Sequence, residues 1–214
     1  MFRSKQCHRI DRPFAYAMCF MMVALMGLTA CVQMPKLPID IPSNAPAVVP
    51  FKGHPRVVLV LGSGGVRGAA HVGVIKELKK HHVPIDIIVG TSSGSIVGAL
   101  YADQNDINAV ERVVKSATRD DLMHISWWHW QSGLVSGHCL QNFLLSHMRA
   151  RSFNQLKTKF IAVATDFNSG EPQFLESGPI APAVNASSAV PVVFKPVYLY
   201  HHLLVDGGLS QPIA

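Results

Sequence analysis

From Arg56 onward, short uninterrupted apolar runs alternate with longer stretches whose apolar positions recur at helical spacing. The short apolar runs are rich in Val, Ile and Leu, which is typical of strands buried on both faces. Strands are predicted at 56–61, 85–89, 160–167, 173–175 and 198–205. Helices are predicted up to about residue 81, after residue 95, over 107–114 and over 182–189. Strands that alternate with helices in this way predict an α/β protein with a largely parallel sheet.

The first 30 residues have a different pattern. Four cations precede an apolar run of 15 residues, from Phe14 to Leu28. This run is too short for a membrane-spanning helix, which needs about 20 residues. A charged start, an apolar middle and small residues afterwards predict a secretory signal peptide over 1–30.

The end of this segment is more specific. Leu28-Thr29-Ala30-Cys31 resembles a bacterial lipobox, in which the cysteine is acylated and becomes the first residue after cleavage. We therefore expect Cys31 to carry lipid, with a plain signal peptide as the alternative. In Gram-negative lipoproteins, an aspartate after the lipidated cysteine resembles an inner-membrane retention signal, but this chain has Val32 there. We therefore expect a location in the bacterial cell envelope, at the outer membrane facing the periplasm if the source is Gram-negative.

Residues 31–55 link the lipidated cysteine to the regular part of the chain. Prolines recur at positions 35, 38, 42, 46, 50 and 55. This density favours extended, semi-rigid backbone, which suits a tether between a membrane and a domain over 56–214. A leader with no spacing role is the equal alternative.

Composition narrows the class of protein. The 214 residues are 49% hydrophobic and 15% charged, which excludes a disordered charged chain. The net charge is +6, and four cations and one aspartate already lie in residues 1–30. No remaining stretch resembles a nucleic-acid-binding stripe. Of the four cysteines only Cys139 follows Cys31, so no internal disulfide is expected, and no His/Cys cluster has zinc spacing.

A candidate nucleophile follows the second predicted strand. Gly90-x-Ser92-x-Gly94 falls between a strand and a helix, where small neighbours let a sharp turn expose the serine hydroxyl. The helix start beneath it favours developing negative charge. Ser93 and Ser95 do not fit the glycine spacing, and we expect them to cap the helix.

A glycine-rich loop over 62–68 follows the first predicted strand. Its unobstructed N–H groups at a helix start predict an oxyanion hole, to which Arg67 could add charge unless it only braces the loop. A dinucleotide site is the rival interpretation. However, Arg67 stands where the third glycine of that fingerprint belongs, and no acid ends the next strand. A P-loop would need Gly-Lys-Ser/Thr, which is absent.

Asp206 ends the last predicted strand and precedes two glycines. By itself it would be a turn residue, but beside the other two loops it is the candidate general base. A histidine base is disfavoured because no histidine follows Asp206. His71 is expected to be packed or half-exposed. The sequence thus favours a Ser–Asp dyad over a triad.

Four motifs in this order resemble the patatin-like phospholipases, in particular their bacterial and neuropathy-target-esterase-like branch. They are SGGVRG, GTSSGS, Ala186-Ser187-Ser188-Ala189-x-Pro191-x-x-Phe194-x-Pro196-Val197, and Asp206-Gly207-Gly208. The resemblance implies a three-layer α/β/α sandwich, with Ser92 as nucleophile, Asp206 as base, and no metal or cofactor. It further implies an oxyanion hole lined by the amides of Gly64, Gly65 and Val66, with Arg67 as the basic residue of the glycine loop. It also implies hydrolysis of phospholipid or lysophospholipid esters through an acyl-enzyme.

The short segment after Asp206 keeps a second hypothesis open. The family usually continues beyond the dyad aspartate, so we expect a truncated or minimal form, whose activity is in doubt. A membrane-anchored lipoprotein that keeps the fold and binds lipid or a partner without catalysis is the alternative. Trp127, Trp128 and Trp130 suit either a bilayer-facing edge or ordinary packing. Neither head-group preference nor oligomeric state is indicated.

Overall fold

The computed structural model describes residues 41–122 and 137–214. The predicted signal peptide, Cys31 and the tryptophans at 127, 128 and 130 lie outside the described residues. Within the described ranges, no helix is both long and apolar enough to span a membrane. Residues 41–55 follow the domain surface, where the Val49 carbonyl accepts a hydrogen bond of 3.2 Å from Lys159 Nζ. Ile41 packs against the core.

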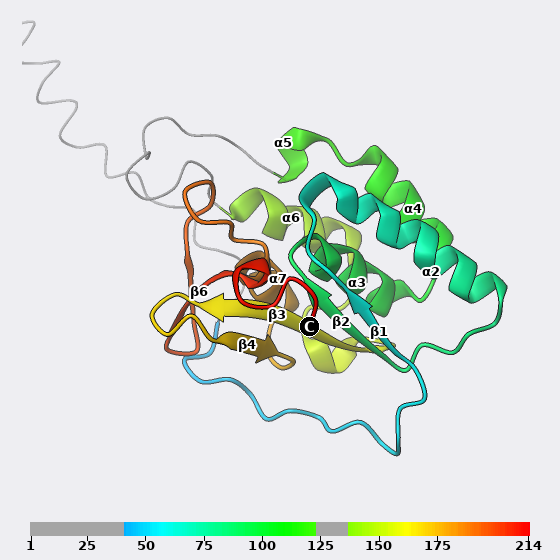
Figure 1. Ribbon diagram of the computed structural model, residues 1–214, viewed down its shortest axis with the longest axis horizontal. Coiled ribbons are helices and arrows are strands. Elements are labelled where there is room, and N and C mark those ends of the chain that lie inside the picture. Colours follow the sequence, from blue (N-terminus) through cyan, green and yellow to red (C-terminus); the bar gives the residue numbers. More distant parts are fainter. Residues whose placement is uncertain (1–40, 123–136) are drawn as a thin grey trace, which may run out of the picture. The chain divides into compact units, whose positions relative to one another are not determined.

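The described residues form one six-stranded mixed sheet (Figure 1). Its strands are β1 (Val58–Leu61), β2 (Ile87–Thr91), β3 (Lys159–Asp166), β4 (Pro172–Leu175), β5 (Val197–Leu199) and β6 (His202–Asp206). The first three strands pair in parallel, whereas β4 and β6 run antiparallel to β3, and β5 runs antiparallel to β6. The predicted α/β class is confirmed. In the antiparallel half, β3–β4 and β5–β6 are hairpins with short connections, whereas β6 returns to β3 after α7.

The register of β3 places two strands end to end. Ala162 pairs with β2 and β4, whereas Ala164 pairs with β4 and β6. Since a strand residue has one neighbour on each side, β2 and β6 share the edge of β3 that faces away from β4 (Figure 1). They run toward each other along this edge: β2 ends at Thr91, opposite Val163, and β6 ends at Asp206, opposite Ala164.

Six α-helices are described, and their labels are those of Figure 1: α2 (Ala70–Lys80), α3 (Ser93–Gln104), α4 (Ile107–Ser116), α5 (Arg119–Leu122), α6 (His138–His147) and α7 (Ile180–Ser187). Short 3₁₀ turns are η1 (Gly65–Ala69), η3 (Phe153–Gln155) and η4 (Gly207–Leu209).

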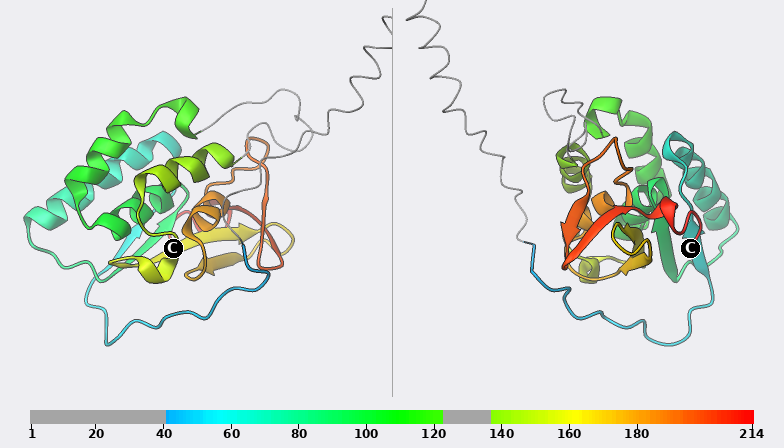
Figure 2. Two further views of the ribbon diagram at one scale, coloured as in Figure 1. Left: turned by 180° about the vertical axis from the view of Figure 1, so that it is seen from behind. Right: turned by 60° about the vertical axis from the view of Figure 1, so that its left-hand side comes forward.

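Helix α3 is the centre of the core because it packs on β2 and β3 and is covered by α2, α4 and α6 (Figure 2). Ten of its residues are buried, among them Leu100 and Tyr101. A helix buried on all sides carries no polar stripe, and Gly98 lets it approach the sheet, since a Cβ there would lie 3.0 Å from the Phe160 ring. Helix α7 packs on β3 and β6 in the same way.

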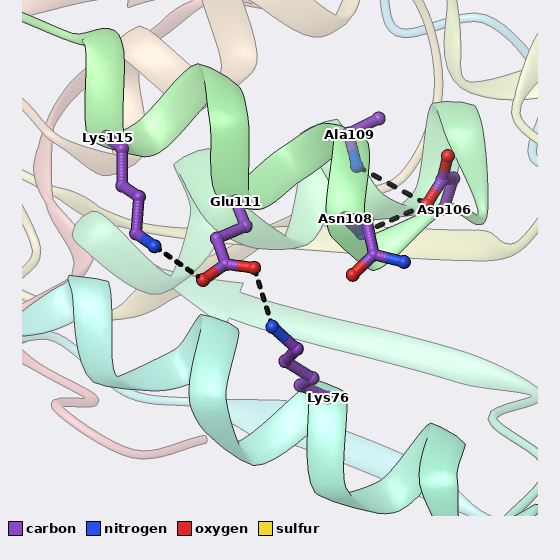
Figure 3. A network of polar contacts seen from close by, with 6 residues as sticks. All are labelled: Lys76, Asp106, Asn108, Ala109, Glu111 and Lys115. Atoms are coloured by element: carbon purple, nitrogen blue, oxygen red, sulfur yellow. Dashed lines mark hydrogen bonds and ion pairs between the residues drawn. The ribbon is translucent and has the colours of Figure 1, made fainter.

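Polar contacts fasten the outer helices α2 and α4 to each other (Figure 3). Glu111 of α4 accepts from Lys76 of α2 at 2.7 Å and from Lys115 at 2.8 Å. The two ammonium groups lower the pKa of Glu111 to about 2. Asp106 caps α4, because its side chain accepts hydrogen bonds from the Asn108 and Ala109 N–H groups.

Most predicted elements are present, with boundaries that shift by about two residues. The exception is the last predicted strand, 198–205, which is in fact the β5–β6 hairpin. Its two turn residues, Tyr200 and His201, have φ of 51° and 67°. Positive φ at both central positions suits a tight hairpin, but neither residue is the Asn or Gly that signals one in a sequence. The single-strand prediction was therefore wrong.

Candidate active site

Ser92 lies on a strained turn between β2 and α3. Its φ of 53° and ψ of −120° lie outside the regions that L-residues usually occupy. The turn closes because two glycines leave room for it: a Cβ on Gly90 would lie 2.6 Å from Ser95 Cα, and one on Gly94 would lie 2.1 Å from the Leu61 carbonyl oxygen. Strain of this kind concentrates at functional sites, and here it presents the Ser92 hydroxyl beyond the end of β2.

The structure brings Ser92 and Asp206 together. Ser92 Oγ donates a hydrogen bond of 2.6 Å to Asp206 Oδ2, although the residues are 114 positions apart in the sequence. The contact follows from the end-to-end arrangement of β2 and β6 along one edge of β3. Both side chains are buried, with exposed fractions of 8% for Ser92 and 5% for Asp206.

The surroundings of Asp206 favour its neutral form. Burial raises the pKa of this carboxyl above 3.8, and the hydrogen bonds from Ser92 and from the Gly208 N–H partly offset the rise. The Gly208 N–H donates to Oδ1 at 2.7 Å, which leaves Oδ2 facing Ser92. A desolvated carboxylate with one oxygen on a serine hydroxyl is a stronger base than a surface aspartate.

The glycine loop packs against the residues that flank this pair. A Cβ on Gly68 would lie 2.5 Å from Ser93 Cβ, and one on Gly208 would lie 3.0 Å from Ser63 Oγ. The loop is held further by the Ser63 N–H, which donates to the Pro212 carbonyl at 2.9 Å. It therefore lies beside both the turn that carries Ser92 and the turn that carries Asp206.

Three of the four predicted oxyanion donors have free N–H groups. Within the described residues, the N–H groups of Gly64, Gly65 and Val66 donate to no protein acceptor, as expected at a helix start. All three residues are exposed, and Val66 is 96% exposed. The Arg67 N–H differs because it already donates to the Gly64 carbonyl at 3.1 Å. Arg67 thus contributes a side chain, and closes the first turn of η1.

The serines beside Ser92 do not cap α3 as predicted. Ser92 itself occupies the N-cap position without a capping hydrogen bond from its side chain. Ser95 Oγ instead donates to the Ser92 carbonyl at 2.6 Å. Ser93 Oγ is buried and has no partner within the described residues. The positive φ of Ser92 turns its side chain toward Asp206, which removes it from the capping geometry.

Sequence reasoning missed the role of His71 and of the serines at the end of α7. His71, which is half-buried, forms a hydrogen bond of 2.9 Å between Nε2 and the Gly62 carbonyl, and so ties α2 to the glycine loop. Ser187 Oγ accepts from the Ser92 N–H at 3.0 Å. The serine pair at 187 and 188 stood out only as part of a family motif.

A cavity of about 620 Å³ lies away from the Ser92–Asp206 pair. It is lined by residues 46–52 and by the start of β3, at the end of the sheet opposite to the carboxyl end of β2. Cys139 is half-buried and unpaired in the described part of the chain. Over the same residues, no group of three His, Cys, Asp or Glu side chains is placed to hold a metal ion.

Comparison with known proteins agrees with this fold. The family model for patatin-like phospholipase matches residues 59–214. An NTE family protein of Mycobacterium tuberculosis, described as uncharacterized, is 33% identical over 172 residues, which are 79% of this chain and 48% of that protein. Lysophospholipase nte1 of Aspergillus fumigatus is 34% identical over 160 residues, covering 71% of this chain and 10% of the relative.

The crystal structure of VipD from Legionella pneumophila has the same fold. It matches with a TM-score of 0.54 at 14% sequence identity, covering 75% of this chain and 46% of that one. The chain belongs to the patatin-like phospholipase family. It spans about half the length of the mycobacterial relative and a tenth of the fungal one.

Proposed function

We propose that the chain is a lipid acyl ester hydrolase of the phospholipase A or lysophospholipase type. The observation that carries the proposal is the hydrogen bond of 2.6 Å between Ser92 Oγ and Asp206 Oδ2, inside a buried turn. Membership of the patatin-like phospholipase family and the lysophospholipase relative support a lipid ester as the substrate.

In the proposed first step, Ser92 Oγ attacks the ester carbonyl carbon while its proton passes to Asp206 Oδ2. The carbonyl oxygen becomes an oxyanion, which the free N–H groups of Gly64, Gly65 and Val66 stabilise. Collapse of this intermediate forms the acyl-serine, and the proton on Asp206 passes to the leaving alcohol.

In the second step, Asp206 takes a proton from water, whose oxygen attacks the acyl-serine carbonyl. The fatty acid is then released, and the proton returns to Ser92 Oγ. The raised pKa of Asp206 supports this double role, because the carboxyl can hold the proton between the two transfers. Neither step calls for a metal or cofactor.

We further propose that the protein is a lipoprotein of the bacterial cell envelope, anchored through Cys31. The lipobox sequence supports this proposal, and a membrane anchor would hold the domain at its substrate. Radiolabelled palmitate should enter the protein expressed in bacteria, and Cys31→Ala should abolish incorporation. Equal incorporation into both proteins would contradict lipidation at this cysteine.

The catalytic proposal is tested by hydrolysis of lysophospholipid and of a p-nitrophenyl acyl ester. Ser92→Ala and Asp206→Asn should each reduce kcat about 10⁴-fold or more, with unchanged circular dichroism. Ser188→Ala serves as the matched control, since it removes a serine hydroxyl from the same site without touching the dyad side chains. Wild-type turnover by Ser92→Ala would contradict the proposal, and a wild-type protein that binds lipid but hydrolyses no ester would favour the non-catalytic alternative.

A further inference from the structure

Three consecutive residues at the C-terminal end of helix α7 each contact the backbone of the dyad. Ser187 Oγ accepts from the Ser92 N–H at 3.0 Å, and Ser188 Oγ donates to the Ser92 carbonyl at 3.2 Å. The Ala189 carbonyl accepts from the Asp206 N–H at 2.9 Å. All three residues are buried. Ser187 and Ala189, which we call the clamp, thus accept from the backbone N–H groups of both members of the dyad.

The clamp fills a gap in the sheet. Along the shared edge of β3, β2 stops at Thr91, opposite Val163, and β6 stops at Asp206, opposite Ala164. The Val163 carbonyl faces this gap, since a Cβ on Gly207 would lie 2.1 Å from its oxygen. The pairing of β2 with β3 does not extend to Ser92, because the chain turns sharply away from the sheet at that residue.

The Ser187 hydroxyl connects Ser92 to β3 across this gap. Its Oγ donates to the Val163 carbonyl at 2.6 Å and accepts from the Ser92 N–H at 3.0 Å. The first bond uses the only hydroxyl proton, so a lone pair remains for the second. This fully buried hydroxyl therefore extends the hydrogen bonding between β2 and β3 by one residue beyond Thr91, and it holds the Ser92 backbone to β3.

We infer that Ser187 is a positioning residue, whose hydroxyl fixes the Ser92 backbone so that Oγ stays within hydrogen-bond distance of Asp206. The inference rests on the proposed function, because positioning matters only if Ser92 reacts. Ser188 is the less important member of the pair. Its acceptor, the Ser92 carbonyl, already receives the shorter bond from Ser95 Oγ, at 2.6 Å against 3.2 Å.

The test compares Ser187→Ala with Ser188→Ala, which removes the same atom from the adjacent residue. Wild type and both variants are treated with a fluorophosphonate, and the rate and the final stoichiometry of labelling are measured by intact mass. Displacement of a reacting group by about 1 Å costs about 100-fold in rate. We expect Ser187→Ala to reach full stoichiometry 10- to 100-fold more slowly than wild type, and Ser188→Ala to remain close to the wild-type rate.

A purely structural role would have a different outcome. It would lower the melting temperature and the fraction of protein that labels, while the remaining fraction reacts at the wild-type rate, and this result would overturn the inference. Equal rates for the two alanine variants would overturn it as well. If Ser187→Ala does not fold, Ser187→Cys supplies the same comparison, because a thiol is a weaker donor and acceptor than a hydroxyl and should also slow labelling.

Failure of the proposed function would be recognised separately. Wild type would then not label at all, and the clamp would be judged by hydrogen exchange at the Ser92 amide. We expect this amide to exchange faster in Ser187→Ala than in Ser188→Ala, since only Ser187 accepts from it. Equal exchange in the two variants would remove the basis for the clamp.

Discussion

The two regions beside Ser92 are built in opposite ways. On one side, Ser92 and Asp206 are buried, and their backbone groups are bonded to Ser187, Ser95 and Ala189. On the other side, Gly64, Gly65 and Val66 are exposed, and their N–H groups have no acceptor within the described residues. The two regions are nevertheless in contact, through Gly68 and Ser93.

This difference follows from what each region has to do in the proposed reaction. The atoms that exchange a proton must keep a fixed separation, which burial and saturated hydrogen bonding provide. The N–H groups that receive an oxyanion must remain unpaired until substrate arrives, which exposure to water permits at little cost. Substitutions in the first region should therefore affect folding as well as rate, whereas those in the second should affect rate alone.

The largest effect is expected for Gly94→Ala in the buried region. The new Cβ would lie 2.1 Å from the Leu61 carbonyl oxygen and 2.7 Å from that of Gly62, both backbone atoms that cannot move independently. We expect a loss of more than about 4 kcal/mol in the free energy of unfolding, measured by urea denaturation, together with loss of activity. Gly73→Ala is the control, since nothing lies within 4 Å of its Cβ. Equal stability of the two variants would contradict a tightly packed turn.

Val66→Pro should separate rate from stability in the exposed region. Proline removes the backbone N–H of residue 66, which is 96% exposed in the wild type and lies at an early helical position that tolerates proline. We expect kcat to fall about 10²- to 10³-fold while the melting temperature stays unchanged. Val66→Ala, which keeps the N–H, should have wild-type kcat. A similar loss of kcat in both variants would mean that the side chain, and not the amide, is important.

The pH dependence of Asp206 gives a smaller effect of defined sign. The folded protein holds the pKa of this carboxyl above 3.8, so it binds more protons than the unfolded chain between 3.8 and the raised value. This contribution to stability is present at low pH and is lost as the pH rises through the folded pKa. Asp206→Asn should therefore have a higher melting temperature than wild type at pH 7, with a difference that shrinks toward pH 3.8.

The ionisation of Asp206 should also be visible in the pH dependence of the wild-type rate. A general base must be ionised, so kcat/KM should rise with pH around a midpoint above 3.8. A melting-temperature difference that grows toward acid pH, or a midpoint below 3.8, would mean that hydrogen bonding outweighs burial at Asp206.

The candidate reacting residues of the site could be predicted from the sequence, but the residues that hold them in place could not. Strand-to-helix context and glycine spacing indicated Ser92 and the loop over 62–68, because local turns need particular residues at fixed offsets. The hydrogen bond of Ser187 to Ser92 could not be predicted in this way, since the two residues are 95 positions apart and a serine has no local signature for that role. The β5–β6 turn was missed because Tyr200 and His201 have positive φ, although neither is a residue that usually signals such a turn.

The central claim is that Ser92 reacts and that Asp206 activates it. The most direct measurement is mass-spectrometric mapping of the fluorophosphonate adduct, in wild type and in Asp206→Asn at neutral pH. The account predicts a single adduct on Ser92 in wild type and greatly slowed labelling of the same residue in Asp206→Asn. An adduct on any other serine, or labelling of Ser92 at an equal rate in both proteins, would contradict it.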